Sequence, residues 1–241
     1  MSSREVARSV VAADGSATAV VGTGKPTSKR DLALRILVTI AALAVWFWTQ
    51  ALLGARTAPS APIGDGLHKL TASLNAYFQS APGAANALLI VSSALIDAIA
   101  IFLLGSWIFA GRLRPFLGLG ILLVTRQMVQ ALCSLPAPPG IIWHDPGFPS
   151  LLVTYGVAND FFFSGHTAIA VFGAIEVARL RRTWLTLLAV GVVVFEIGVV
   201  IVLRAHYTMD VFTGALAAVC VAQFCKNIPD PNPRIAANRT S

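Results

Sequence analysis

Charged residues are scarce in this sequence. Only 12% of its 241 residues are Asp, Glu, Lys or Arg, whereas 56% are hydrophobic. Soluble domains usually carry about twice that share of charge. The shortage excludes an ordinary soluble protein and indicates that much of the surface faces lipid.

Cysteine is also scarce, and its pattern excludes two kinds of site. Cys133, Cys220 and Cys225 form no C-x-x-C pair, so neither a disulfide framework nor a zinc site is expected. The net charge of +7 comes without a nucleic-acid motif, so no nucleic-acid partner is expected. No internal repeat supports a transporter built from two similar halves.

Long hydrophobic runs are present instead. Most of them reach the ~20 residues that a helix needs to cross the hydrocarbon core. Helices are expected because lipid cannot satisfy the backbone of an open sheet. The sequence therefore predicts an all-α membrane protein, a six-helix transmembrane bundle. The six runs are about Leu32–Leu53, Ala84–Phe109, Phe116–Leu135, Ser164–Leu180, Trp184–Leu203 and His206–Cys225.

Lys and Arg are distributed unevenly between these runs. They concentrate in both tails and in the second and fourth connections, whereas the other three connections hold only Arg56, Lys69 and Arg204. By the positive-inside rule, both termini lie in the cytoplasm. We predict a disordered N-terminal tail over residues 1–31, a catalytic domain over 32–225 and a cytoplasmic C-terminal tail over 226–241. The apolar, Pro-rich connection Pro136–Phe163 is expected to pack over the mouth of the bundle.

Two polar stretches begin the fourth and sixth runs, and the topology brings both to the exoplasmic side. One contains Ser164, Gly165 and His166, and the other contains His206 and Asp210. His206 and Asp210 share one helix face, so the carboxylate can accept one ring N–H and leave the other ring nitrogen free to attack. His166 can act as acid and then as base. Helix starts, with Ser164 and Gly165, suit a bound phosphate. These residues indicate phosphoryl transfer between lipids.

The two motifs resemble those of the sphingomyelin synthase family, within the lipid phosphate phosphatase superfamily. The family's C-G-D-x-x-x-S-G-H-T is matched at Asp160 and from Ser164 to Thr167, and its H-Y-T-x-D-V is matched in full from His206 to Val211. The first outer-loop motif, P-L-P-D, is only echoed at residues 62–65. Arg126 fits an upstream arginine motif in part. The resemblance covers roughly residues 62–210.

The resemblance implies a head-group transferase. In such an enzyme His206 forms a phosphohistidine-type intermediate, Asp210 orients it, and phosphocholine or phosphoethanolamine passes from a glycerophospholipid to ceramide. It implies no metal and no cofactor. The related phosphatases carry a lysine and an S-R pair where this chain has Trp107 and Val200. A lipid phosphate phosphatase and a non-catalytic transporter or scaffold stay open as alternatives.

Several further residues are candidates for substrate contact. Arg126 lies inside the third run, where a charge is costly, and Arg204 is two residues before His206; each is a phosphate ligand or a structural charge. Asp160 and Tyr207 belong to the matched motifs. Aromatic residues at Phe161–Phe163, Trp143 and Tyr155 form a choline cage or an interface belt.

The remaining polar residues are assigned structural roles. Asp97 and Glu196 are read as structural, and His68 and His144 as solvated or hydrogen-bonded loop residues. The expected partners are membrane lipids, and a homo-oligomer is left open. The Ala-rich, short-looped chain suggests a bacterial plasma membrane, with a eukaryotic Golgi or plasma membrane as the alternative.

Overall fold

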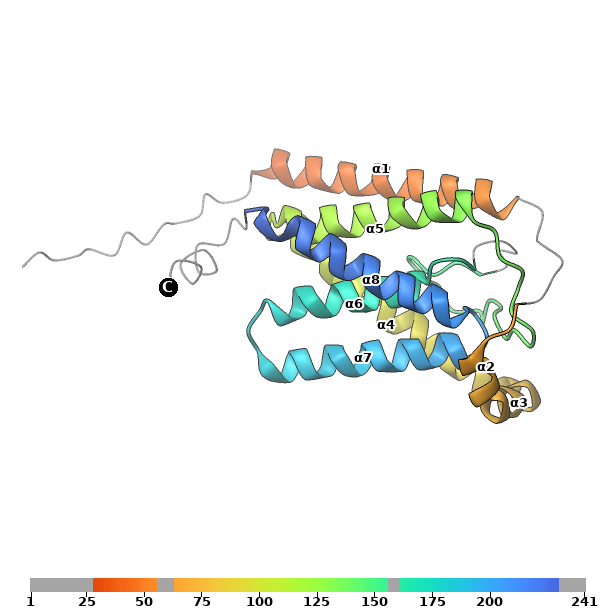
Figure 1. The fold of residues 1–241 in the computed structure, drawn as a ribbon. Helices are drawn as coiled ribbons and strands as arrows, with labels where there is room; N and C mark the ends of the chain where they lie inside the picture. Colours follow the sequence, from red (N-terminus) through yellow and green to blue (C-terminus); the bar gives the residue numbers. More distant parts are fainter. Residues whose placement is uncertain (1–27, 56–62, 156–160, 230–241) are drawn as a thin grey trace, which may run out of the picture.

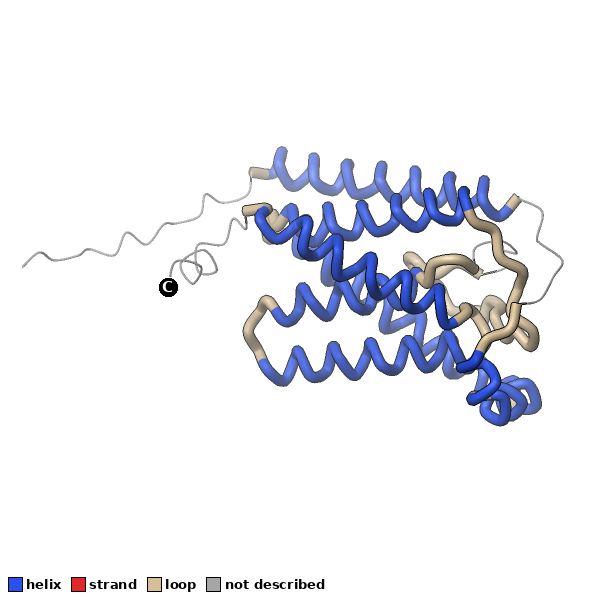
Figure 2. Tube along the Cα trace, in the orientation of Figure 1, coloured by secondary structure: helices blue, strands red, loops and turns tan. Residues whose placement is uncertain are grey.

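The computed structural model describes residues 28–55, 63–155 and 161–229. Within these residues the chain forms eight α-helices, one short 3-10 helix and no strand (Figure 2). The predicted all-helical class is therefore confirmed. Residues 1–27 and 230–241, which make up most of the predicted tails, and Asp160 lie outside the described residues.

Five helical segments among the described residues are long and apolar enough to cross a membrane. The fourth predicted run, Ser164–Leu180, forms a helix of 14 residues, which at 1.5 Å per residue spans ~21 Å. This is shorter than a hydrocarbon core of ~30 Å, so the count of six spans stays a prediction. The five segments are α1 (Lys29–Gly54), α4 (Pro82–Ile108), α5 (Leu113–Leu132), α7 (Thr183–Val202) and α8 (Thr208–Phe224). The 3-10 helix η1 (Cys225–Asn227) extends α8. The shorter helix is α6 (Gly165–Ala178).

Helix α6 lies at the centre of the bundle. It packs against α4, α5, α7 and α8, as Figure 1 shows for the last two. Its buried residues are small at several positions, and Phe172 fills the contact with α5. A Cβ at Gly214 of α8 would lie 2.5 Å from the backbone oxygen of Ser164, so only glycine allows this approach. The packing therefore joins the first turns of α6 and α8.

One end of the bundle, which we call the site end, contains the starts of α6 and α8. Two short helices, α2 (Gly66–Leu70) and α3 (Ala72–Ser80), lie there, whereas α1 begins and α8 ends at the opposite end (Figure 1). From α3, Asn75 donates hydrogen bonds to the backbone oxygens of Gly140 and Val202 over 3.1 and 2.9 Å. These bonds fix α3 against the end of α7.

The connection between α5 and α6 packs into the bundle rather than extending away from it. Leu152 and Val153 are buried in the main hydrophobic core. The carboxylate of Asp97 in α4 accepts hydrogen bonds from the N–H groups of Leu151 and Leu152 over 2.9 and 3.2 Å. The described part of this connection therefore packs against the bundle as predicted, residues 156–160 lie outside the described residues, and Asp97 has the structural role expected of it. Asp97 anchors the connection that covers the site.

A charged cluster holds the helices together at the opposite end. Arg114 of α5 donates to both carboxylate oxygens of Glu176 in α6, with a shortest distance of 2.9 Å. Arg179 also lies 3.1 Å from Glu176. Because Glu176 is buried, each partner offsets the cost of removing its charge from water. The cluster fixes the far end of α6 and thereby its orientation in the bundle.

Candidate active site

The two histidine motifs are joined by a backbone hydrogen bond. Ser164 donates its N–H to the backbone oxygen of Asp210 over 3.0 Å. Two residues with positive φ flank the motifs, Phe163 at 80° and Arg204 at 59°. Such conformations are uncommon for residues with a side chain and are often found at functional sites. The start of α6 and the start of α8 thus form one unit, although the histidines are 40 residues apart in sequence.

His166 lies on the first turn of α6 and is buried. Its ring makes an edge contact with Trp143, with 5.1 Å between ring centroids. Its Nε2 atom makes no hydrogen bond with any residue that the structure describes. A buried polar atom of this kind usually has a partner, so this nitrogen is available to a substrate.

His206 is held differently from the expectation. Its Nδ1 donates to the backbone oxygen of Phe161 over 2.8 Å, and Asp210 Oδ2 lies 3.8 Å away, beyond hydrogen-bond distance. A carbonyl only accepts, so Nδ1 carries the proton and neutral His206 keeps a lone pair on Nε2. That is the protonation state a nucleophile requires.

Asp210 also binds the backbone rather than the histidine ring. Its Oδ2 accepts from the N–H of Tyr207 over 2.8 Å and so caps the first turn of α8. The predicted hydrogen bond from His206 to Asp210 is therefore wrong, because His206 Nδ1 donates to Phe161 instead and Asp210 Oδ2 accepts the capping bond. At 3.8 Å the carboxylate still stabilises positive charge on His206.

Arg126 brings a positive charge to the start of α6. A Cβ at Gly165 would lie 3.2 Å from Arg126 Nε, so the glycine lets the arginine side chain approach this turn. Arg126 Nη1 donates to Gln50 over 2.7 Å, and its guanidinium lies over the Trp46 ring, 5.3 Å from the centroid. A guanidinium beside a helix N-terminus is a suitable environment for an anion.

These groups line one cavity of about 40 Å³. The size suits a small polar group and not a whole lipid, since one water needs ~10–15 Å³. None of the described residues that line the cavity is a carboxylate, which favours an anionic occupant. The lining includes both candidate histidines, the arginine and one motif glycine: Arg126, Gly165, His166 and His206, with Trp46, Leu123, Trp143 and Phe161 among the apolar walls.

Three predicted substrate ligands do not line this cavity. Ser164 is the N-cap of α6 and accepts from the N–H and hydroxyl of Thr167. Arg204 donates to the backbone oxygen of His68. Tyr207 donates its hydroxyl to Pro136 over 3.1 Å. These three residues support the site from outside, and Asp160 lies outside the described residues.

A pair of residues before α3 was missed as part of the site. Asp65 accepts from the N–H of Thr208 over 2.6 Å and from its hydroxyl over 2.7 Å, and it also caps α2 through His68. His68 Nε2 donates to the backbone oxygen of His206 over 2.9 Å, and its ring stacks on Tyr207. Of the two roles expected for His68, solvated or hydrogen-bonded, the structure shows the second: His68 is hydrogen-bonded and buried, and it lies in α2 rather than in a loop.

The electrostatics of this pair fit its contacts. Burial acts to raise the pKa of Asp65, yet the hydrogen bonds from Thr208 and His68 outweigh it and hold the pKa below its ordinary 3.8. Burial lowers the pKa of His68 from its ordinary 6.5, against the raising effects of His206 and Asp65. A charged Asp65 and a neutral His68 therefore hold the backbone on both sides of Tyr207. The only signals in the sequence were the echoed P-L-P-D motif and an aspartate at a helix start.

Metal chemistry has no obvious ligands in the described part of the chain. No group of three or more His, Cys, Asp or Glu side chains there is arranged to hold a metal ion. The candidate chemistry is built from two histidines, one carboxylate and one arginine.

Comparisons with known proteins give the family. No solved structure matches. The chain is 23% identical over 150 residues to phosphatidylcholine:diacylglycerol cholinephosphotransferase 1 of Arabidopsis thaliana; the match covers 62% of this chain and 48% of that protein, about half its length. Its name describes head-group transfer between lipids, the coarser part of what the motifs implied, and does not mention ceramide. The sequence model of the AtPDCT1/2 family matches residues 65–227, which include Asp65 and both histidine motifs. The chain belongs to the AtPDCT1/2 family.

Proposed function

We propose that this protein is a membrane phosphotransferase that moves the phosphocholine head group of a glycerophospholipid to the free hydroxyl of a second lipid. The observation that carries the proposal is the pairing of His166 and His206 in one cavity with Arg126. One histidine has an unbonded Nε2, and the other is held in the tautomer that leaves Nε2 unprotonated. The similarity to a cholinephosphotransferase supports the same reaction class.

The first half of the proposed reaction forms a covalent intermediate. Nε2 of His206 attacks the phosphorus of the donor lipid, and the bond from phosphorus to the glycerol oxygen breaks. Protonated His166 gives its proton to this oxygen, and the donor leaves as diacylglycerol. Asp210 stabilises the charge on His206, and Arg126 with the α6 N-terminus stabilises the phosphoryl oxygens.

The second half reverses the roles. The hydroxyl of the acceptor lipid loses its proton to His166, which is now neutral, and attacks phosphorus. The N–P bond to His206 breaks, and the new phospholipid leaves with His166 protonated again. Because each proton lost by His166 is regained, no other acid or base is required.

The acceptor divides the proposal into two candidates. The similarity to the plant enzyme favours diacylglycerol, whereas the S-G-H-T and H-Y-T-x-D-V motifs favour ceramide. We favour diacylglycerol, because the family match covers residues 65–227 and the motifs cover only two short stretches. Ethanolamine in place of choline is the second candidate head group.

A second space beside the cavity supports the choice of choline as the head group. A depression of about 470 Å³ is lined by the aromatic side chains of Trp143, Phe148 and Tyr155 and by Asp145. It shares Trp143 and Val153 with the cavity. Aromatic faces with a nearby carboxylate suit a quaternary ammonium. The head-group nitrogen would thus lie in the depression while its phosphate lies at the histidines.

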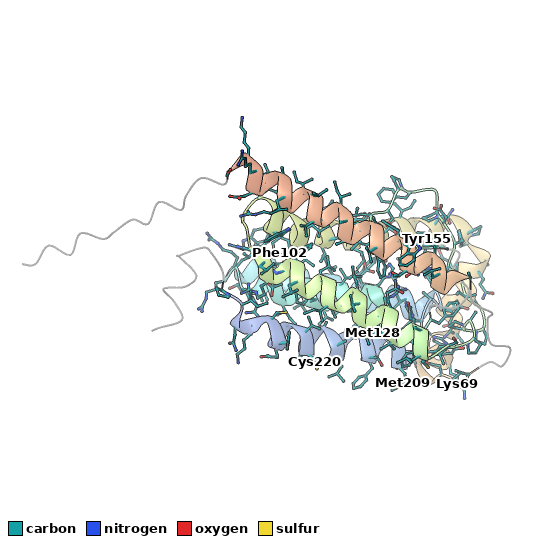
Figure 3. The ribbon with its side chains drawn as sticks, turned by 90° about the horizontal axis from the view of Figure 1, so that it is seen from above. Lys69, Phe102, Met128, Tyr155, Met209 and Cys220 are labelled. Atoms are coloured by element: carbon teal, nitrogen blue, oxygen red, sulfur yellow. The ribbon has the colours of Figure 1, made fainter. Side chains whose placement is uncertain are left out.

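A transfer assay tests the proposal. The purified protein in phosphatidylcholine vesicles receives fluorescent diacylglycerol or fluorescent ceramide, and labelled phospholipid is measured. We expect product from diacylglycerol and none with His206→Ala. Met209→Ala is the control, because Met209, labelled in Figure 3, is in the first turn of α8 three residues after His206, is 62% exposed and does not line the cavity. Release of free phosphocholine without labelled phospholipid would instead mean that water, and not a second lipid, is the acceptor; release of phosphate from phosphatidic acid, with no transfer product, would indicate a phosphatase.

The proposed topology has six spans, with residues 32–225 as the catalytic domain. The short helix α6 is the fourth span in chain order. In this arrangement the site end is exoplasmic and both tails are cytoplasmic, in a bacterial plasma membrane. Lys69 is exposed at the site end (Figure 3). Lys69→Cys in a Cys133→Ser, Cys220→Ser background should react with an impermeant maleimide added outside intact cells, and reaction only after lysis would reverse the orientation.

A further inference from the structure

An apolar groove runs along the contact between α1 and α5. Its volume is about 480 Å³, within the ~300–1,000 Å³ of small-molecule sites. Figures 1 and 3 both show α1 beside α5, with Met128 on α5 in Figure 3. Val45, Trp46, Gly120, Leu123, Val124 and Met128 are among the residues that line the groove, and no charged side chain does.

The groove adjoins the cavity that contains the two histidines. Trp46 and Leu123 line both. At this junction Gln50 accepts hydrogen bonds from Arg126 and from Gln127, a residue of the groove, over 2.7 and 3.1 Å. The environment therefore changes from apolar to polar at the place where the groove reaches Arg126.

The two spaces differ in size and in access. The cavity, at about 40 Å³, has no room for a hydrocarbon chain. The groove has about twelve times that volume, and Val124 and Met128 on its outer wall are 59% and 60% exposed. It is open sideways, toward the region that lipid chains occupy around a membrane-spanning helix.

We propose that the groove between α1 and α5 binds an acyl chain of the lipid whose phosphate lies at His166 and His206. This inference rests on the proposed function and adds the place where the lipid tail binds. The ester end of the chain lies near Trp46 and Leu123, and the hydrocarbon extends along Val45, Gly120 and Val124. An acyl chain fits because the lining is mostly apolar and has no charged side chain; its polar residues are Thr39, Thr49 and Gln127.

Gly120 offers a direct test. A Cβ at this position meets nothing within 4 Å, so a larger side chain extends into the groove without displacing protein atoms. Leucine is also a better helix former than glycine. Gly120→Leu should therefore keep the fold and fill the space of several methylene groups. Gly191→Leu is the matched control: its Cβ is equally unobstructed, and it lies on α7 away from the groove.

The measurement is head-group transfer from dipalmitoyl phosphatidylcholine and from dihexanoyl phosphatidylcholine, each at matched concentration in detergent micelles. Gly120→Leu should lower the ratio of long-chain to short-chain kcat/KM by about tenfold, because fewer methylene groups are buried. Gly191→Leu should leave the ratio at the wild-type value. An unchanged ratio in Gly120→Leu overturns the inference while the proposed function stands. No transfer by the wild-type protein from either lipid overturns the proposed function.

Photo-crosslinking tests the groove independently of turnover. Phosphatidylcholine with a diazirine at the end of one acyl chain is bound to His206→Ala protein, irradiated and digested. Crosslinks should fall on α1 and α5 peptides that contain Val45 and Val124, and excess dipalmitoyl phosphatidylcholine should suppress them. Crosslinks spread over all lipid-facing helices, or insensitive to competitor, mean an ordinary lipid boundary and contradict the inference.

Discussion

Asp65 binds Thr208 twice, through the backbone N–H over 2.6 Å and through the hydroxyl over 2.7 Å. Thr208 is two residues after His206, so these bonds fix the chain that carries the proposed nucleophile. His68 binds the backbone oxygen of His206 itself. The segment before α3 thus acts as a clamp, defined here as Asp65 and His68, on the start of α8.

Loss of the clamp should slow the reaction more than it weakens substrate binding. Asp65→Ala removes both bonds to Thr208 and a helix cap worth ~0.5–2 kcal/mol. We expect kcat to fall by roughly ten- to a hundredfold, because a small displacement of the reacting groups slows the chemical step by about this much. KM should change less than threefold. Asp31→Ala on α1, an exposed aspartate in the first turn, is the control. A rise in KM at constant kcat would instead assign Asp65 to substrate binding.

The two histidines should be separable by the leaving group of the donor. Nitrophenyl phosphocholine releases a phenolate that leaves without a proton, so the acid is not required for the first step. His166→Ala should therefore release nitrophenol at a substantial fraction of the wild-type burst while losing transfer from phosphatidylcholine. His206→Ala should lose both. Equal loss of the burst in the two variants would contradict the assignment of acid and nucleophile.

The clamp should make stability depend on pH near neutrality. Burial lowers the pKa of His68 from its ordinary 6.5, and Asp65, Arg204 and Asp210 are the charges that face it. The unfolded chain then binds more protons than the folded one, so the stabilising contribution of His68 is complete above pH 6.5 and is lost as pH falls below it. The thermal midpoint of the wild type relative to His68→Gln should therefore decrease from pH 8 to pH 5. If the thermal midpoint of the wild type exceeded that of His68→Gln by more at pH 5 than at pH 8, His68 would be charged in the folded protein.

The aromatic depression should set the head-group preference. Phe148→Ala removes a face worth roughly 0.5–2 kcal/mol to a bound cation, a ~2- to 30-fold effect on KM. The effect should be larger for phosphatidylcholine, because an ethanolamine ammonium can still donate hydrogen bonds to Asp145. Phe212→Ala, 59% exposed on α8, is the control. Equal changes in KM for both lipids would exclude this depression as the head-group site.

The sequence predicted the helices well, because long apolar runs have few alternatives in lipid. It misplaced the end of α5, which stops at Leu132 rather than Leu135. Pro136 explains this in part, since proline disfavours helix in the residue before it. It did not predict α2 and α3, which are short and have no membrane-length apolar pattern. Their tertiary hydrogen bonds, from Asp65 and Asn75, stabilise them instead.

The structure brings four of the candidate site residues into one cavity, Arg126, Gly165, His166 and His206, but without the hydrogen bond expected between His206 and Asp210. The spacing of His206 and Asp210 predicted a shared helix face; their side chains lie 3.8 Å apart, but His206 precedes α8, which begins at Thr208. Spacing alone could not show that Asp210 caps Tyr207 while Phe161 accepts from His206. Both bonds depend on how the α6 and α8 starts pack, which is a tertiary property. His68 was missed for the same reason, because its burial comes from contacts 138 residues away along the chain.

The most direct test of the account is to find the phosphocholine group on the protein. The purified enzyme is mixed with phosphatidylcholine in the absence of acceptor, quenched in base to preserve a phosphoramidate, digested and analysed by mass spectrometry. The account predicts a phosphocholine adduct on His206, absent in His206→Ala and removed when diacylglycerol is added. An adduct on another residue, or full transfer by His206→Ala, would contradict it.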